Sequence, residues 1–125
     1  MQIKQLTVGI NTGQLTQCRD FYVTHFGFTV DYEGNGYLQI LSPDRQFLLG
    51  FAQPNNPNLP PGEILPFQGE GVWLAFEVED VDAEYERLGK VLPIHTAIRD
   101  EPWGERHFVV RDPSGASVNV MTMKH

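Results

Sequence analysis

The sequence has little cysteine, little positive charge and no long apolar run. Its single cysteine, Cys18, excludes an internal disulfide and a multi-cysteine metal site. A net charge of −7 argues against a nucleic-acid partner, whose phosphates would be repelled, and favours a cationic small molecule. No apolar stretch reaches membrane-spanning length, and the start MQIKQLTV lacks a signal-peptide pattern, so we expect no membrane partner and a cytoplasmic protein.

The first half of the chain has the pattern of one strand, one helix and three strands. Residues Gln2 to Asn11 alternate apolar and polar side chains, as a half-buried strand does. Apolar positions recur every three or four residues from Leu15 to Phe26, and Gly27 stands where a helix C-terminal glycine belongs, which predicts a helix with Cys18 buried on its inner side. Three short runs then predict a strand meander, at residues 28–33, 37–41 and 46–52.

A proline-rich segment follows. Five of the nine prolines lie between Gln53 and Gly69, so this segment cannot form a long regular element. We interpret it as a connector that acts either as a stiff linker or as a lid. Its apolar residues Ile64, Leu65 and Phe67 would then cover a pocket or a partner subunit.

The second half repeats the order of the first. A strand is predicted at residues 72–79, a helix capped by Asp80 from Val81 to Gly89, and a less regular strand at 91–98. A hairpin of strands 105–111 and 116–122, joined by the turn Asp112-Pro113-Ser114-Gly115, closes the chain. The fold class is therefore α+β, one domain over residues 1–125, with βαβββ modules at 1–53 and 71–125 and a connector at 54–70.

The two halves can be aligned through their strands and turns. Thr7 corresponds to Trp73, and Pro43 corresponds to Pro113 of the hairpin turn. This turn match sets three first-half residues against three second-half residues of one strand face, namely Phe47, Leu49 and Phe51 against Ser117, Asn119 and Met121.

Several motifs, taken in order, resemble the vicinal oxygen chelate superfamily, which includes glyoxalases, extradiol dioxygenases and bleomycin-resistance proteins. They are Phe21-Tyr22 before Gly27-Phe28, the segment LAFEVEDVD at residues 74–82, Pro102-Trp103-Gly104, and the Asp112–Gly115 turn. The resemblance implies sheets curled around a shared cavity with helices outside, commonly completed in a homodimer.

In metal-using members of that superfamily the ligands come from strands that face the cavity. The resemblance carries those positions onto Thr7, Leu49, Trp73 and Asn119. None of these side chains is a good ligand, because such sites need imidazole, carboxylate or thiolate donors. We therefore expect no metal and no cofactor, and we lean against an enzyme.

An enzyme remains the alternative, of glyoxalase or dioxygenase type, with unrecognised ligands or a metal-free base. The four histidines are scattered at positions 25, 95, 107 and 125, without the spacing of a local metal motif. Glu77, Glu105 and His107 are the candidate bases, and a carboxylate would need burial to raise its pKa. A surface or interface role is the other interpretation of His107.

The run from Pro102 to Phe108 resembles the metal-free bleomycin-resistance branch, whose acidic dimers bind a flat, cationic antibiotic. Aromatic side chains would stack on such a ligand, with hydrogen bonds from Thr7 and Asn119. The predicted function is metal-independent binding or sequestration of a small organic ligand, cationic and aromatic in character, by Thr7, Phe47, Leu49, Phe51, Trp73, Trp103 and Asn119. The competing interpretation is that Phe47, Phe51 and Trp73 fill a vestigial cavity as core.

Overall fold

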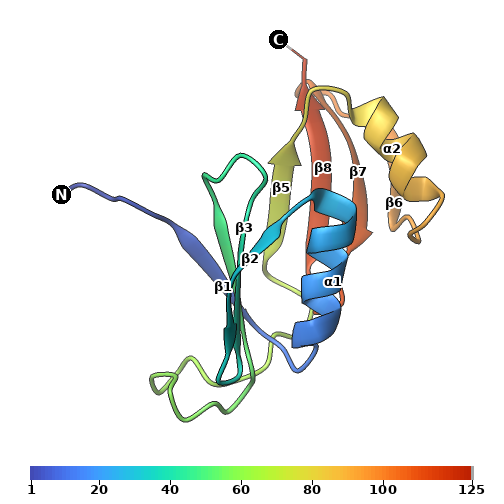
Figure 1. Cartoon of the computed structure of the whole chain (residues 1–125). Coiled ribbons are helices and arrows are strands. Elements are labelled where there is room, and N and C mark those ends of the chain that lie inside the picture. The colour runs from blue at the N-terminus through green and yellow to red at the C-terminus, as the bar shows by residue number, and fades with distance from the viewer. Residues whose placement is uncertain (125) are drawn as a thin grey trace. The chain divides into compact units, whose positions relative to one another are not determined.

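The computed structural model describes residues 1–124 and divides into two compact units, Met1–Gln68 and Gly69–His125. Each unit contains one helix and one four-stranded sheet, so the α+β fold with two βαβββ modules is confirmed (Figure 1). Among the described residues, neither helix is long and apolar enough to cross a membrane.

Both sheets have the same topology. The first has the order β1-β4-β3-β2 and the second β5-β8-β7-β6, with a parallel pair at β1–β4 and β5–β8 and antiparallel pairs elsewhere. The elements of the first unit are β1 Thr7–Asn11, α1 Leu15–Phe26, β2 Thr29–Gly34, β3 Tyr37–Leu41 and β4 Leu48–Ala52. Those of the second are β5 Trp73–Glu77, α2 Val81–Gly89, β6 Thr96–Asp100, β7 Glu105–Arg111 and β8 Ser117–Met123.

Two predicted strands are shorter or shifted in the structure. β1 begins at Thr7 rather than at residue 2, because β4, the strand on which it pairs, starts at Leu48 opposite Thr7. β6 begins at Thr96 rather than at residue 91, because the N–H groups of Val91 and Leu92 bond back to the Leu88 carbonyl at 3.1 and 2.8 Å. The chain therefore continues as a turn after α2, and β6 begins only at Thr96.

Each helix covers one face of the sheet in its own unit. In the first unit Tyr22 of α1 is fully buried, with its ring centroid 5.7 Å from that of Phe51, and Cys18 is buried as predicted. In the second unit the residues beneath α2 include Phe108, Val118 and Val120, all with 1% exposure or less. Since successive strand residues point to opposite faces, each sheet keeps a second face that its own helix does not cover.

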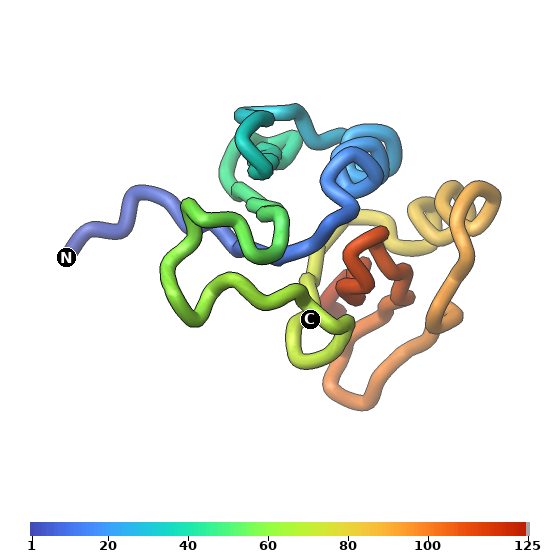
Figure 2. Tube along the Cα trace, turned by 90° about the horizontal axis from the view of Figure 1, so that it is seen from below, coloured from blue at the N-terminus to red at the C-terminus, as the bar shows by residue number. Residues whose placement is uncertain are grey.

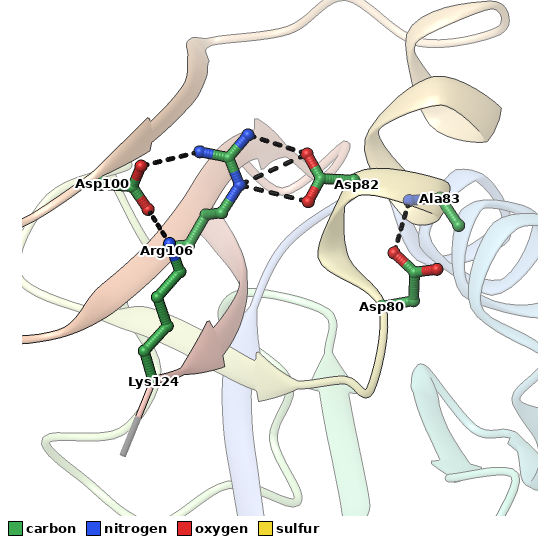
Figure 3. A network of polar contacts seen from close by, with 6 residues as sticks. All are labelled: Asp80, Asp82, Ala83, Asp100, Arg106 and Lys124. Atoms are coloured by element: carbon green, nitrogen blue, oxygen red, sulfur yellow. Dashed lines mark hydrogen bonds and ion pairs between the residues drawn. The ribbon is translucent and has the colours of Figure 1, made fainter.

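The start of α2 is held by two polar anchors. Asp80 is the N-cap, and its carboxylate accepts a hydrogen bond of 3.0 Å from the Ala83 N–H, as the sequence predicts. Arg106 of β7 donates to Asp82 of the helix at 2.8 Å and to Asp100 of β6 at 3.0 Å (Figure 3). These contacts fix the helix to the sheet outside the apolar core.

The connector is tied to the end of β1, and its residues 54–68 belong to the first unit. The Asn11 side-chain amide donates to the carbonyls of Glu63 and Leu65, the latter at 2.9 Å, and the Phe67 N–H donates to the Asn11 carbonyl at 2.9 Å. Figure 2 shows this segment as a long irregular loop in green. The segment is anchored rather than a free linker, and its role as a lid stays a prediction.

The structure corrects the predicted direction of Leu49 and Phe51. Leu49 pairs in register with Val8 and Phe51 with Ile10, so both side chains share the helix-covered face, opposite to Thr7, and they are 5% and 0% exposed. The error comes from the loop before β4. This loop closes from the Ser42 N–H to the Phe47 carbonyl, whereas the second closes from Asp112 to Ala116 and is one residue shorter. A one-residue slip exchanges the two faces of a strand.

Candidate functional site

The second sheet has a cavity of about 480 Å³ on the face that α2 does not cover. Alternating side chains of β7 and β8 line it, together with one residue each from β5 and β6 and from the segments before β6 and β7. The lining residues are Trp73, His95, Thr96, Trp103, Glu105, His107, Val109, Ser117 and Asn119, all in the second unit.

Two tryptophans form the aromatic part of this cavity. Trp73 is the first residue of β5 and is 70% exposed, and Trp103 is 64% exposed. A tight turn positions Trp103: the Glu101 N–H donates to the Glu105 carbonyl at 2.7 Å, and the Gly104 N–H donates to the Glu101 carbonyl at 3.1 Å. Gly104 has a φ of +96°, which favours glycine, so Pro102-Trp103-Gly104 is the motif that this turn requires.

A chain of hydrogen bonds crosses the cavity wall, and we call it the His107 relay. Arg99 donates to Glu101 at 3.1 Å, and His107 Nε2 lies 2.7 Å from the other Glu101 oxygen. His107 Nδ1 lies 2.7 Å from Asn119 Oδ1, and Asn119 Nδ2 donates to Glu105 Oε2 at 3.1 Å. The side chains of Glu101, His107 and Glu105 are 10%, 12% and 13% exposed, so the relay is largely shielded from water.

The geometry of the relay favours the protonated form of His107. The bond from Asn119 Nδ2 to a carboxylate orients the amide, so its oxygen faces His107. Both ring nitrogens therefore lie opposite oxygen acceptors, an arrangement that favours the imidazolium, in which both nitrogens donate. Burial alone would lower the pKa of His107, but the hydrogen bonds to Glu101 and Asn119 and the two carboxylate charges raise it above its usual value. The bond from His107 is the main cause that lowers the pKa of Glu101.

The structure brings together five of the residues singled out from the sequence, Trp73, Trp103, Glu105, His107 and Asn119. The His107 side chain is 12% exposed in the cavity wall, so it is not a freely exposed surface histidine, and its interface role stays a prediction. Thr7 and Phe47 lie in the first unit and are exposed, so their binding role stays a prediction. Leu49 and Phe51 are core residues of the first unit. Glu77 is exposed on the same sheet face as Trp73 but does not line the cavity.

Sequence reasoning missed several residues of this site. His95, Thr96, Val109 and Ser117 line the cavity, and Glu101 binds His107 from outside the lining set. Val109 and Ser117 could have been found, because they are two residues from His107 and Asn119 on their strands and so share their faces. Glu101 gave no such signal, because its carboxylate reaches His107 only through the turn around Trp103.

Comparison with known proteins places the chain in a family. The model of the glyoxalase/bleomycin resistance protein/dioxygenase superfamily matches residues 3–120. The chain belongs to this superfamily. No curated protein sequence matches the chain.

Solved structures of the superfamily share the fold of this member. A glyoxalase/bleomycin resistance protein/dioxygenase from Nocardioides aligns with a TM-score of 0.79 and 20% identity, covering 98% of this chain and 85% of that one. A superfamily member from Sphaerobacter thermophilus aligns with a TM-score of 0.74 and 18% identity, covering 97% and 98%. TnmS3, an antibiotic binding protein from Streptomyces sp. CB03234, aligns with a TM-score of 0.70 and 23% identity, covering 99% and 97%.

The residues of this superfamily member do not fit the metal of its metal-using relatives. By strand register, Gly50 and not Leu49 occupies the position equivalent to Asn119. The four positions therefore carry a hydroxyl, no side chain, an indole and an amide, which do not form a divalent-metal site. Among residues 1–124, no group of three histidine, cysteine or acidic side chains is arranged to hold a metal ion. In the relay, both nitrogens of His107 are already committed to protein oxygens.

Proposed function

We propose that the second unit binds a flat organic cation, without a metal, in the cavity between Trp73 and Trp103. One observation carries this proposal: two largely exposed indoles and the largely shielded carboxylate of Glu105 line the same cavity. Contiguous exposed apolar patches mark binding sites more often than single exposed residues do, and two indoles on one cavity favour binding.

The charges on the cavity wall favour a cation over an anion. Arg99 and His107 together offset the charges of Glu101 and Glu105 within the relay, so the attraction for a cation comes locally from Glu105, the carboxylate that lines the cavity. An indole face attracts a cation by about 0.5–2 kcal/mol, more as the contact loses water. The aromatic faces and the carboxylate therefore act in the same direction on a positively charged ring.

A relative supports small-molecule binding as the function. TnmS3 is described as an antibiotic binding protein and shares the fold of this chain over nearly its whole length. Sequestration of an antibiotic-like ligand is accordingly the form of binding that we propose. A homodimer and a cytoplasmic location stay predictions, and light scattering on purified protein tests the first.

The enzyme alternative has less support. Both ring nitrogens of His107 are engaged by oxygens of the protein, 2.7 Å away in each case, which disfavours a role as a base toward a ligand. Glu77 is exposed and does not line the cavity, so it is not placed to act on a ligand bound there. Glu105 is the remaining candidate base, and turnover of any bound ligand would favour that role.

Tryptophan fluorescence tests the proposal directly, because the chain has two tryptophans and both line the cavity. 9-Aminoacridine is a flat cation at neutral pH, and acridine-9-carboxylate is a flat anion of similar size. We expect saturable, one-to-one quenching by the cation and at least about tenfold weaker binding of the anion. Trp73→Phe and Trp103→Phe leave one reporter each, and both remaining signals should respond.

The matched variants separate stacking from general effects. Trp73→Ala should weaken 9-aminoacridine binding by about tenfold or more, measured by calorimetry. Phe47→Ala removes an exposed aromatic side chain of the first unit and tests whether that unit contributes. Unchanged emission with 9-aminoacridine, or equal affinity for the two probes, would contradict the proposal.

A further inference from the structure

The two carboxylate oxygens of Glu105 have different surroundings. Oε2 accepts a hydrogen bond from Asn119 Nδ2 at 3.1 Å. The contact of Oε1 within residues 1–124 is with His107 Nδ1 at 3.7 Å, which is too long for a hydrogen bond. The Nδ1–H is in any case directed at Asn119 Oδ1, 2.7 Å away. Oε1 is therefore an acceptor that the relay positions but does not use.

Glu101 at the other end of the relay has no such oxygen. Its Oε1 accepts from Arg99 and its Oε2 accepts from His107. Glu101 is also not a lining residue of the cavity, whereas Glu105 is. The relay thus satisfies one carboxylate fully and presents a single oxygen of the other to the cavity.

No fully buried polar side-chain atom among the described residues lacks a hydrogen-bond partner, so Glu105 Oε1 is open to water, and a ligand donor would take the place of that water. The Glu105 side chain is 13% exposed, so water reaches it only in part. Hydrogen bonds to an ionised group are roughly twice as strong as neutral ones, and they are directional. A quaternary nitrogen supplies charge but no donor, whereas a protonated amine, amidine or amino-heterocycle supplies both.

We propose that Glu105 Oε1 accepts a hydrogen bond from the ligand, so that the cavity selects flat aromatic cations whose charge is carried on an N–H over quaternary cations of the same shape. This inference rests on the proposed function, that is, on binding of a flat cation at this cavity. It adds the acceptor atom and the chemical class of the ligand. Asn119 positions Glu105 by donating to its Oε2, and His107 in turn holds the Asn119 amide.

Two probes test the class of ligand in the unmodified protein. 9-Aminoacridine carries its charge with N–H donors, and 10-methylacridinium is a permanent cation of similar size without one. We expect 9-aminoacridine to bind at least about tenfold more tightly, by calorimetry and by tryptophan quenching. Binding of both probes with equal affinity would overturn the inference and leave the proposed function standing. Binding of neither would overturn both.

The variant Glu105→Gln tests the acceptor atom. The glutamine oxygen can still accept from Asn119, and its NH2 group then replaces Oε1 on the cavity side. We expect this variant to lose at least about tenfold in affinity for 9-aminoacridine and to bind the two probes alike. Glu79→Gln removes the same charge from an exposed position outside the cavity lining and should keep the preference. A preference that survives in Glu105→Gln would overturn the assignment of Glu105.

Discussion

The two units have the same backbone plan and different open faces. Register along the strands matches Gly50 with Asn119, Thr7 with Trp73 and Tyr37 with His107. The helix-covered faces are alike, since Leu38 and Phe108 are equivalent and both are fully buried. The scaffold is therefore shared, and the cavity chemistry comes from a few residues on one face.

In the first unit, the Tyr37 ring covers the part of the sheet that corresponds to the open cavity face of the second unit. A Cβ on Gly50 would lie 2.5 Å from the hydroxyl oxygen of Tyr37, so a larger residue there would have to displace that ring. Tyr37 donates to Gln39 Oε1 at 2.9 Å, and Gln39 donates to Asp31 at 2.7 Å. Burial, with the charge of Asp31, raises the pKa of Tyr37 and keeps it a neutral donor. In the first unit a phenol covers the sheet, whereas in the second a charged relay borders a cavity.

The largest expected effect is on stability, and it compares Phe51, a buried residue of β4, with Phe47, the exposed residue just before that strand. Phe51→Ala should lower the free energy of unfolding by about 3–5 kcal/mol, because Phe51 is fully buried against Tyr22 of α1. Phe47→Ala should cost less than about 1 kcal/mol, because Phe47 is 56% exposed. Chemical denaturation measures both. Equal costs would contradict the corrected direction of these side chains.

The sequence predicts the order of elements well, because that order depends on local periodicity and on residues such as Gly27 and Asp80. It fails at Leu49 and Phe51, because the face of a strand depends on the exact length of the loop before it. The Ser42–Phe47 loop and the Asp112–Ala116 loop share a proline turn and differ by one residue after it. A turn match between halves cannot detect an insertion beyond the turn.

The next largest expected effect tests the His107 relay, which the first unit lacks. Asn119→Leu removes the acceptor of His107 Nδ1 and the donor to Glu105, leaving charged groups without partners in a shielded wall. We expect a loss of about 1–3 kcal/mol in the free energy of unfolding, together with weaker binding of 9-aminoacridine. Ser117→Ala, two residues away on the same face, should change stability by less than about 0.5 kcal/mol.

The pH dependence of this variant gives a second readout. A raised histidine pKa stabilises the folded state fully below the unfolded pKa, and this contribution is lost as the pH rises through the folded pKa. Asn119→Leu should lower the pKa of His107, which NMR titration of the imidazole measures. An unchanged His107 titration would contradict the relay.

The candidate site was only partly predictable from the sequence, because strand periodicity shows which residues share a face but not which hydrogen bonds they form. Trp73, Asn119 and Trp103 follow from strand parity and from a recognisable motif. The protonation of His107 does not, because it depends on two distances of 2.7 Å that join residues on β7, on β8 and in a turn. Hydrogen-bond geometry of this kind has no periodic signal in a sequence.

The smallest expected effect concerns how the second unit holds its helix. Arg106 binds Asp82 and Asp100 (Figure 3). The equivalent residue of the first unit is Gly36, which has no side chain. Hydrogen bonding from Arg106 lowers the pKa of Asp82, and bonding from Lys124 lowers that of Asp100. A lowered aspartate pKa stabilises the fold above the unfolded pKa, and that contribution is lost as the pH falls through the folded pKa. Arg106→Gln should therefore be less stable than the unmodified protein at neutral pH, and the difference should shrink in acid and in high salt. Arg111→Gln, on the same strand, is the control and should show neither trend. Parallel curves of stability against pH for all three proteins would contradict the role of Arg106.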